Sequence, residues 1–93
     1  MAKIHNDQEL EVSTEGRYKL ESGIDDIGCR ICQSITEGHA TLDKLTMYFW
    51  ENPAKLIKRS EKARENQKEC RKYIRGYLNW MLDNHWITIR IKK

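Results

Sequence analysis

The sequence predicts one small domain of the α+β class, with three to four helices packed on a small antiparallel sheet. Polar and apolar residues alternate at both ends of the chain, within residues 9–21 and 86–93, as in strands with one buried face. Between them, apolar residues recur every three or four positions, which is the period of amphipathic helices. We expect an N-terminal hairpin and a C-terminal strand to form the sheet. A chain of 93 residues suits one modest core.

The N-terminal part of the chain is predicted to form the hairpin. Residues 1–8 are polar, and we expect a flexible segment there, followed by a single domain over residues 9–93. Two alternating runs, Glu9–Ser13 and Arg17–Glu21, are separated by three residues that include Gly16, which suits a short hairpin loop. The apolar face of this hairpin would consist of Leu10, Val12, Tyr18 and Leu20.

The first helix is predicted from one stripe of isoleucines. They recur at i, i+3, i+7 and i+11, as Ile24, Ile27, Ile31 and Ile35. Asp25 and Asp26 fall in the first turn, where the helix dipole favours anions, and Gly38 ends the helix. Gly28 lies inside it and costs about 1 kcal/mol relative to alanine, which indicates close packing against another backbone.

A second helix is predicted to begin after Thr41, whose side chain suits an N-cap. Its apolar stripe consists of Leu42, Leu45 and Phe49. Asn52-Pro53 then changes the chain direction, because asparagine suits a cap and proline suits the first helical position.

The stretch from Asn52 to Asn84 is too long for one helix of a compact domain, because it would span about 48 Å. Residues 58–69 contain a single apolar residue, Ala63. We therefore expect a short helix at Pro53–Arg59 and a strong one at Gln67–Asn84, joined by a polar stretch that is helical or loop-like. The larger aromatic residues near this helix, among them Tyr73, Tyr77, Trp80 and Trp86, are expected in one core.

The C-terminal residues predict a strand. Asn84 tolerates the left-handed conformation that often ends a helix. From Trp86 to Lys93 the residues alternate strictly, so that Ile87, Ile89 and Ile91 would face inward. This strand needs a partner, and the N-terminal hairpin is the candidate.

Basic charge is concentrated in one segment. The net charge is +3, but residues 1–51 carry −5 and residues 52–75 carry +6. Concentrated basic charge favours binding to phosphate backbones, since each neutralised phosphate releases counterions. The alternative is a solvated helix face, on which Glu61–Arg64, Glu65–Lys68 and Glu69–Lys72 pair within the helix.

The order of helix, short helix, long basic helix and strand resembles that of winged helix-turn-helix domains. The resemblance rests on Ile31–Gly38, on Ala40–Leu45, and on Tyr73–Ile87 for the recognition helix and the start of the wing. Two features depart from the pattern. The segment between Phe49 and Gln67 is much longer than the usual turn, and one strand follows the last helix where a wing normally has two.

This resemblance implies a small DNA-binding protein, a transcriptional regulator, whose last helix enters or flanks the major groove of double-stranded DNA. Arginine can read guanine, whereas lysine more often contacts phosphates. Dimerisation is expected for such a reader, because one short helix contacts few base pairs. We expect the nucleic-acid contacts to come from Lys62, Arg64, Lys68, Arg71, Lys72, Arg75, Arg90 and Lys92.

Helical spacing places four of these cations on one side of the helix at Gln67–Asn84, and we expect this basic side to face solvent. The four are Lys68, Arg71, Lys72 and Arg75, and an apolar side of Cys70, Ile74, Tyr77 and Met81 lies elsewhere on the helix.

A zinc site is the alternative for the cysteines. Cys29 and Cys32 have metal-ligand spacing, and His39 or Cys70 could complete a tetrahedral set, as could His5 or His85. However, both cysteines of the pair fall on the isoleucine-striped helix, where cysteine behaves as a small hydrophobic residue. We therefore expect no metal, and reduced thiols, because an odd number of cysteines does not suit a disulfide framework.

The rival function is protein binding. In this reading the chain is a viral or plasmid-encoded adaptor or inhibitor, with an exposed contact patch of Tyr77, Trp80 and Trp86. No catalytic motif or phosphate-binding loop occurs, so we expect neither an enzyme nor a cofactor. No apolar run is long enough to span a membrane, and the N-terminus does not resemble a signal peptide, so a cytoplasmic protein is expected.

Overall fold

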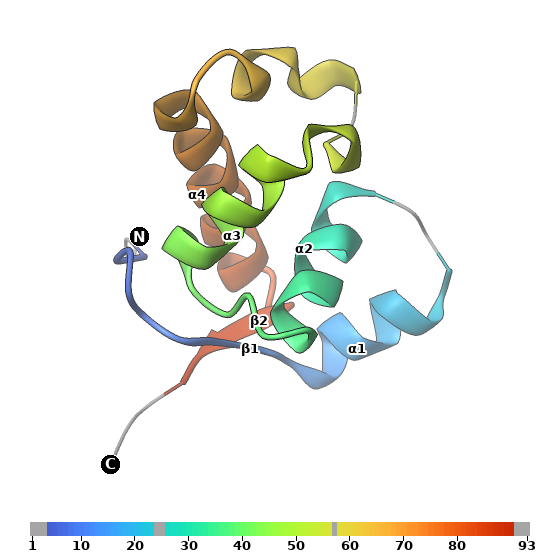
Figure 1. Cartoon of the computed structure of the whole chain (residues 1–93). Helices are drawn as coiled ribbons and strands as arrows, with labels where there is room; N and C mark the ends of the chain where they lie inside the picture. Colours follow the sequence, from blue (N-terminus) through green and yellow to red (C-terminus); the bar gives the residue numbers. More distant parts are fainter. Residues whose placement is uncertain (1–3, 24–25, 57, 91–93) are drawn as a thin grey trace.

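A computed structural model describes residues 4–23, 26–56 and 58–90 of the chain, and confirms the α+β class. Four α-helices pack with a small two-stranded antiparallel sheet, an arrangement consistent with a winged-helix-like fold (Figure 1). Two 3₁₀-helices, η1 and η2, connect α3 to α4. The elements in chain order are β1 (Leu10–Val12), α1 (Thr14–Glu21), α2 (Ile27–Thr36), α3 (Leu42–Glu51), η1 (Pro53–Lys55), η2 (Lys58–Arg64), α4 (Gln67–Asp83) and β2 (Ile87–Ile89).

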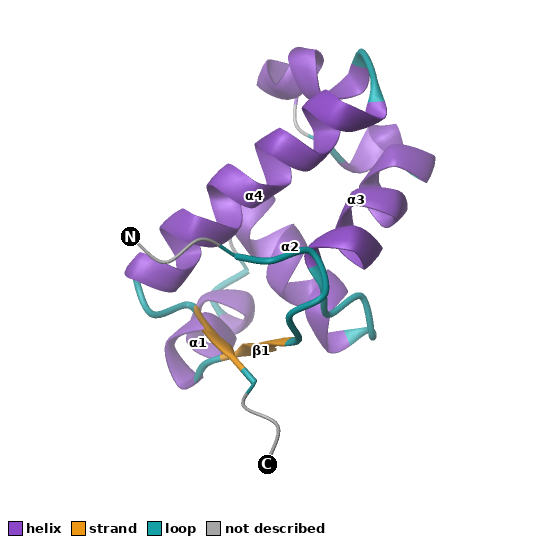
Figure 2. Ribbon diagram, turned by 90° about the vertical axis from the view of Figure 1, so that its left-hand side faces the viewer, coloured by secondary structure: helices purple, strands orange, loops and turns teal. Residues whose placement is uncertain are grey.

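The sheet joins the two ends of the chain. The two strands β1 and β2 lie side by side (Figure 2). They pair antiparallel, with Val12 opposite Ile87 and Leu10 opposite Ile89. On the other side of β1, the Leu10 amide donates to the Ala40 carbonyl at 2.7 Å, so the α2–α3 connection lies beside the same strand. Leu10 and Ile87 are buried, and the sheet thereby closes one end of the core.

The predicted hairpin is wrong, because Thr14–Glu21 is a helix and not a turn and a strand. Ser13 caps this helix, and its hydroxyl accepts a hydrogen bond from the Gly16 amide at 3.1 Å. Gly16 is buried under the carbonyl of Trp86, where a Cβ atom would overlap that oxygen. It therefore serves close packing, and Tyr18, expected on the inner face of the sheet, is 73% exposed.

The three core helices begin at the side-chain caps that suit their sequences. The caps of α2, α3 and α4 are Asp26, Thr41 and Asn66, respectively. Each cap side chain accepts a hydrogen bond from the amide three residues later. Asp26 is therefore a cap and not a first-turn residue. The predicted stripes of α2 and α3 are buried, and their described members are Ile27, Ile31, Ile35, Leu42, Leu45 and Phe49. On α4 the buried residues are Cys70, Ile74, Leu78 and Met81, whereas Tyr77, expected on the same side, is only partly buried. Ile24, Asp25, Ile91 and Lys92 lie outside the described residues.

The expected break before α4 is present. The predicted short helix at Pro53–Arg59 is divided, since η1 ends at Lys55 and Leu56 is extended. The polar stretch that follows is mostly 3₁₀-helical, and buried Ala63 anchors η2 on α4. The longest extent of the molecule is 36 Å, which confirms that an unbroken helix of about 48 Å does not fit.

Two boundary expectations change. Asn84 is not left-handed, with φ of −95°, and the left-handed residue is His85, with φ of 62°.

Residues 4–8 pack on the domain, although we expected a flexible segment through residue 8. Ile4 is 2% exposed, and the carbonyl of Asn6 accepts from the Asp43 amide at 3.1 Å.

Replacement by alanine is expected to have opposite effects at two of the helical glycines, Gly16 and Gly76. Gly16→Ala places a Cβ against a backbone oxygen and should lower the free energy of unfolding by about 1–3 kcal/mol. The Cβ of Gly76→Ala would meet no atom of another described segment within 4 Å, and this substitution should raise the free energy of unfolding by roughly 0.5–1 kcal/mol through helix propensity. Urea denaturation of both variants measures the difference. Equal changes in the two variants would show that the contact of Gly16 with Trp86 is not tight.

Candidate functional site

The exposed cations of α4 lie in its N-terminal half. Lys68 and Lys72 are exposed and one helical turn apart. The pairs that a solvated face would form, Glu65–Lys68 and Glu69–Lys72, are absent from the ion pairs of the described residues. These two lysines are therefore available to a ligand.

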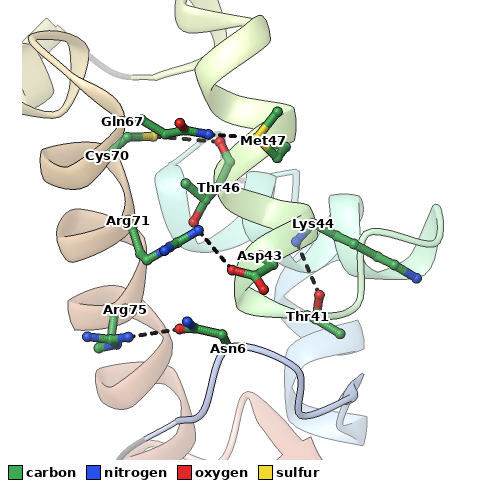
Figure 3. A network of polar contacts seen from close by, with 10 residues as sticks. All are labelled: Asn6, Thr41, Asp43, Lys44, Thr46, Met47, Gln67, Cys70, Arg71 and Arg75. Atoms are coloured by element: carbon green, nitrogen blue, oxygen red, sulfur yellow. Dashed lines mark hydrogen bonds and ion pairs between the residues drawn. The ribbon is translucent and has the colours of Figure 1, made fainter.

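Arg71 and Arg75, predicted on the same exposed side, contact other segments of the chain (Figure 3). The Arg71 guanidinium lies 2.9 Å from a carboxylate oxygen of Asp43 on α3. Arg75 donates to the side-chain oxygen of Asn6 at 2.9 Å. Both arginines lie between the core stripe of α4 and its exposed lysines, and both are half-buried. The expectation that the whole basic side faces solvent is therefore wrong.

The remaining predicted cations are divided between η2 and the sheet. Lys62 and Arg64 are exposed on η2, which packs on α4, and Arg64 also donates to the Leu56 carbonyl. Arg90 follows β2, where its guanidinium lies 2.8 Å from Glu11 and 3.6 Å from Glu9. Arg90 is thus paired with carboxylates of β1 and of the residue before it, and it is not grouped with the lysines of α4. Lys68 and Lys72 of α4, together with Lys62 and Arg64 of the adjoining η2, are called the α4 cation group below.

The residues of the zinc alternative are not brought together. Cys29, Cys32 and Cys70 are buried, and the Cys70 thiol donates to the Thr46 carbonyl at 3.8 Å. His39 stacks on Tyr48, with ring centroids 4.2 Å apart. Within the described residues, no three His, Cys, Asp or Glu side chains form a group that could hold a metal ion.

An aromatic groove lies between α4 and the start of α2, with a volume of about 530 Å³. Trp80 and Trp86 meet edge to face with ring centroids 5.2 Å apart, and Trp80 is 49% exposed. This exposure corrects the expectation that Trp80 is a core residue. The residues that line the groove are Asp26, Gly28, Lys72, Tyr73, Gly76, Tyr77, Trp80 and Trp86.

The signal for this groove was only partly readable in the sequence. Tyr77, Trp80 and Trp86 form the contact patch of the rival hypothesis, and all three line the groove. Gly28 was expected to allow a close backbone contact, but its neighbour is the Trp86 ring, 2.8 Å from where a Cβ would lie. No pattern within α2 could indicate a contact with a residue nearly sixty positions later.

No protein-family model, curated protein or solved structure matches the chain. Among the residues that the structure describes, no helix is both long and apolar enough to cross a membrane.

The contacts of Arg71 and Arg75 predict that they contribute to stability. Arg71→Ala/Arg75→Ala should lower the free energy of unfolding by about 1–2 kcal/mol, because a half-exposed ion pair and a side-chain hydrogen bond are lost. The matched double variant Lys68→Ala/Lys72→Ala should stay within about 0.5 kcal/mol of wild type. Urea denaturation at low salt compares them. An arginine variant as stable as the lysine variant would contradict these contacts.

The buried Cys32 thiol predicts a loss of stability at alkaline pH. Burial raises the pKa of Cys32 to about 12 from 9.0, and Cys29 and Asp26 add to the shift. Between these values the unfolded state releases the proton and the folded state keeps it. Stability should therefore fall as pH rises above 9, by about 1.4 kcal/mol per pH unit from this thiol. Denaturation of wild type and Cys32→Ala between pH 8 and 11 isolates the effect, and equal slopes would refute it.

Proposed function

We propose that this protein is a small DNA-binding regulator that contacts double-stranded DNA through the α4 cation group. The observation that carries the proposal is the pair Lys68 and Lys72, exposed and without an ion pair among the described residues. They lie on the helix that the winged helix-turn-helix resemblance assigns to the major groove. The winged-helix-like arrangement of the elements supports the same assignment.

The roles of the cations differ. Lys62 and Lys68 would hold phosphates, since an ammonium group carries little base information. Arg71 and Arg75, the residue type best suited to guanine, are engaged with Asp43 and Asn6. Binding is therefore expected to be dominated by the phosphate backbone, with a steep dependence on salt and a weak preference for sequence.

Protein binding is the second candidate, and the exposed Trp80 favours it. Tryptophan is enriched at the centres of protein interfaces, and a side chain of this size is 49% exposed here. An adaptor of this kind would not bind duplex DNA in a salt-dependent manner.

The duplex contact is tested by fluorescence anisotropy with a labelled 20-base-pair DNA at several salt concentrations. Lys62→Ala/Lys68→Ala should weaken binding at least about fivefold and should reduce the slope of log K against log salt by roughly 2. The control is Arg17→Ala/Lys44→Ala, which removes the same charge from exposed residues beside Glu9 and Glu11. If both double variants bind as wild type does, or if wild type does not bind, the proposal fails.

A further inference from the structure

The aromatic groove is open at position 76, where a residue larger than glycine would partly fill it. Gly76 lies in the middle of α4 and lines the groove, and among the described residues a Cβ at this position would meet no atom of another segment within 4 Å. A helix-interior glycine costs about 1 kcal/mol relative to alanine. Unlike Gly16 and Gly28, Gly76 has no close contact within the described residues that requires glycine. Because position 76 has no side chain, it leaves the aromatic rings of the groove uncovered.

Positive charge lies beside the aromatic rings of the groove. Lys72 lines the groove from α4, and Lys68 lies one turn before. The Lys19 ammonium on α1 lies 5.7 Å from the centroid of the Trp86 ring. Asp26 is the one acidic residue of the lining, and one of its carboxylate oxygens accepts from the Cys29 amide at 2.8 Å. Aromatic surface with cations at its edges suits an anionic ligand that carries a flat ring.

We propose that this groove binds an unpaired nucleobase of a single-stranded nucleic acid. The base would stack against Trp80, and Lys72 and Lys68 would contact the adjoining phosphates. The second oxygen of Asp26 would accept from an N–H donor of the base, such as the N3–H of thymine. This site is additional to the duplex contact, with which it shares Lys68 and Lys72.

An extended anionic peptide suits the groove less well than a base does. Peptide recognition by added strands depends on free main-chain donors and acceptors along the site. The walls here are the flank of α4 and the first turn of α2, so the backbone groups of α4 are hydrogen-bonded within the helix. Base stacking needs only exposed rings and neighbouring cations, which the groove offers.

The base site is tested with fluorescein-labelled single-stranded 12-mers in an anisotropy titration. One probe is oligothymidine, and the other has the same sugar-phosphate backbone without bases. Wild type should bind the abasic probe at least fivefold more weakly, since stacking of one base is worth about fivefold or more in affinity. Trp80→Ala should bind oligothymidine at least fivefold more weakly than wild type, and should no longer distinguish the two probes.

Two further variants control for folding and for exposed aromatic surface. Tyr18→Ala removes a 73% exposed ring from α1 and should bind both probes as wild type does. Gly76→Leu fills the groove while retaining both tryptophans, and should lose the preference for bases while its circular dichroism spectrum and melting temperature stay at or above wild type.

The inference is overturned if wild type binds both probes equally, or if Trp80→Ala and Gly76→Leu retain the preference for oligothymidine. A groove that receives a protein segment instead would give this result. The duplex contact is judged separately by Lys62→Ala/Lys68→Ala on duplex DNA, so the two proposals can fail independently.

Discussion

The fold depends on the close approach of the backbone around Trp86 to α1. The Trp86 carbonyl accepts from the Ser13 amide at 2.9 Å and lies against Gly16, where no side chain could fit. Its ring packs over Gly28 at the start of α2 and contacts Trp80 on α4. One residue after the last helix therefore joins α1, α2 and α4. The same contact places β2 directly beside β1, which sets the register of the sheet.

This constraint explains which parts of the fold could be predicted from the sequence. The helices α2, α3 and α4 have strong apolar periods and side-chain caps, so their existence and most boundaries follow from local residues. Helix α1 could not be recognised, because residues 17–21 alternate as in a strand and Gly16 resembles a turn residue. The need for glycine at position 16 comes from Trp86, seventy positions away. A single sequence does not show such a contact.

The same limit applies to the candidate site. Helical spacing correctly placed Lys68 and Lys72 on an exposed side of α4. It could not separate them from Arg71 and Arg75, because the partners Asp43 and Asn6 belong to segments far away in the sequence. The aromatic residues were expected in the core from their size, yet four of them line an open groove. Because Arg71 and Arg75 are engaged within the chain, the number of cations in the sequence overestimates the charge that α4 presents to a ligand.

Helix α4 is divided lengthwise into surfaces with different tasks. One stripe of α4 fills the core. Beside this stripe, Arg71 contacts α3 and Arg75 contacts the N-terminal segment. The surface that remains combines lysines, aromatic rings and one glycine with open space above it. The packing of the domain requires neither the lysines nor the glycine, whereas Tyr73, Tyr77 and Trp86 also pack against the core. Alanine at position 76 would stabilise the helix, so an open groove beside unpaired lysines is a departure from the most stable sequence. Such departures are expected at binding sites, and this one lies on the helix that we propose contacts nucleic acid.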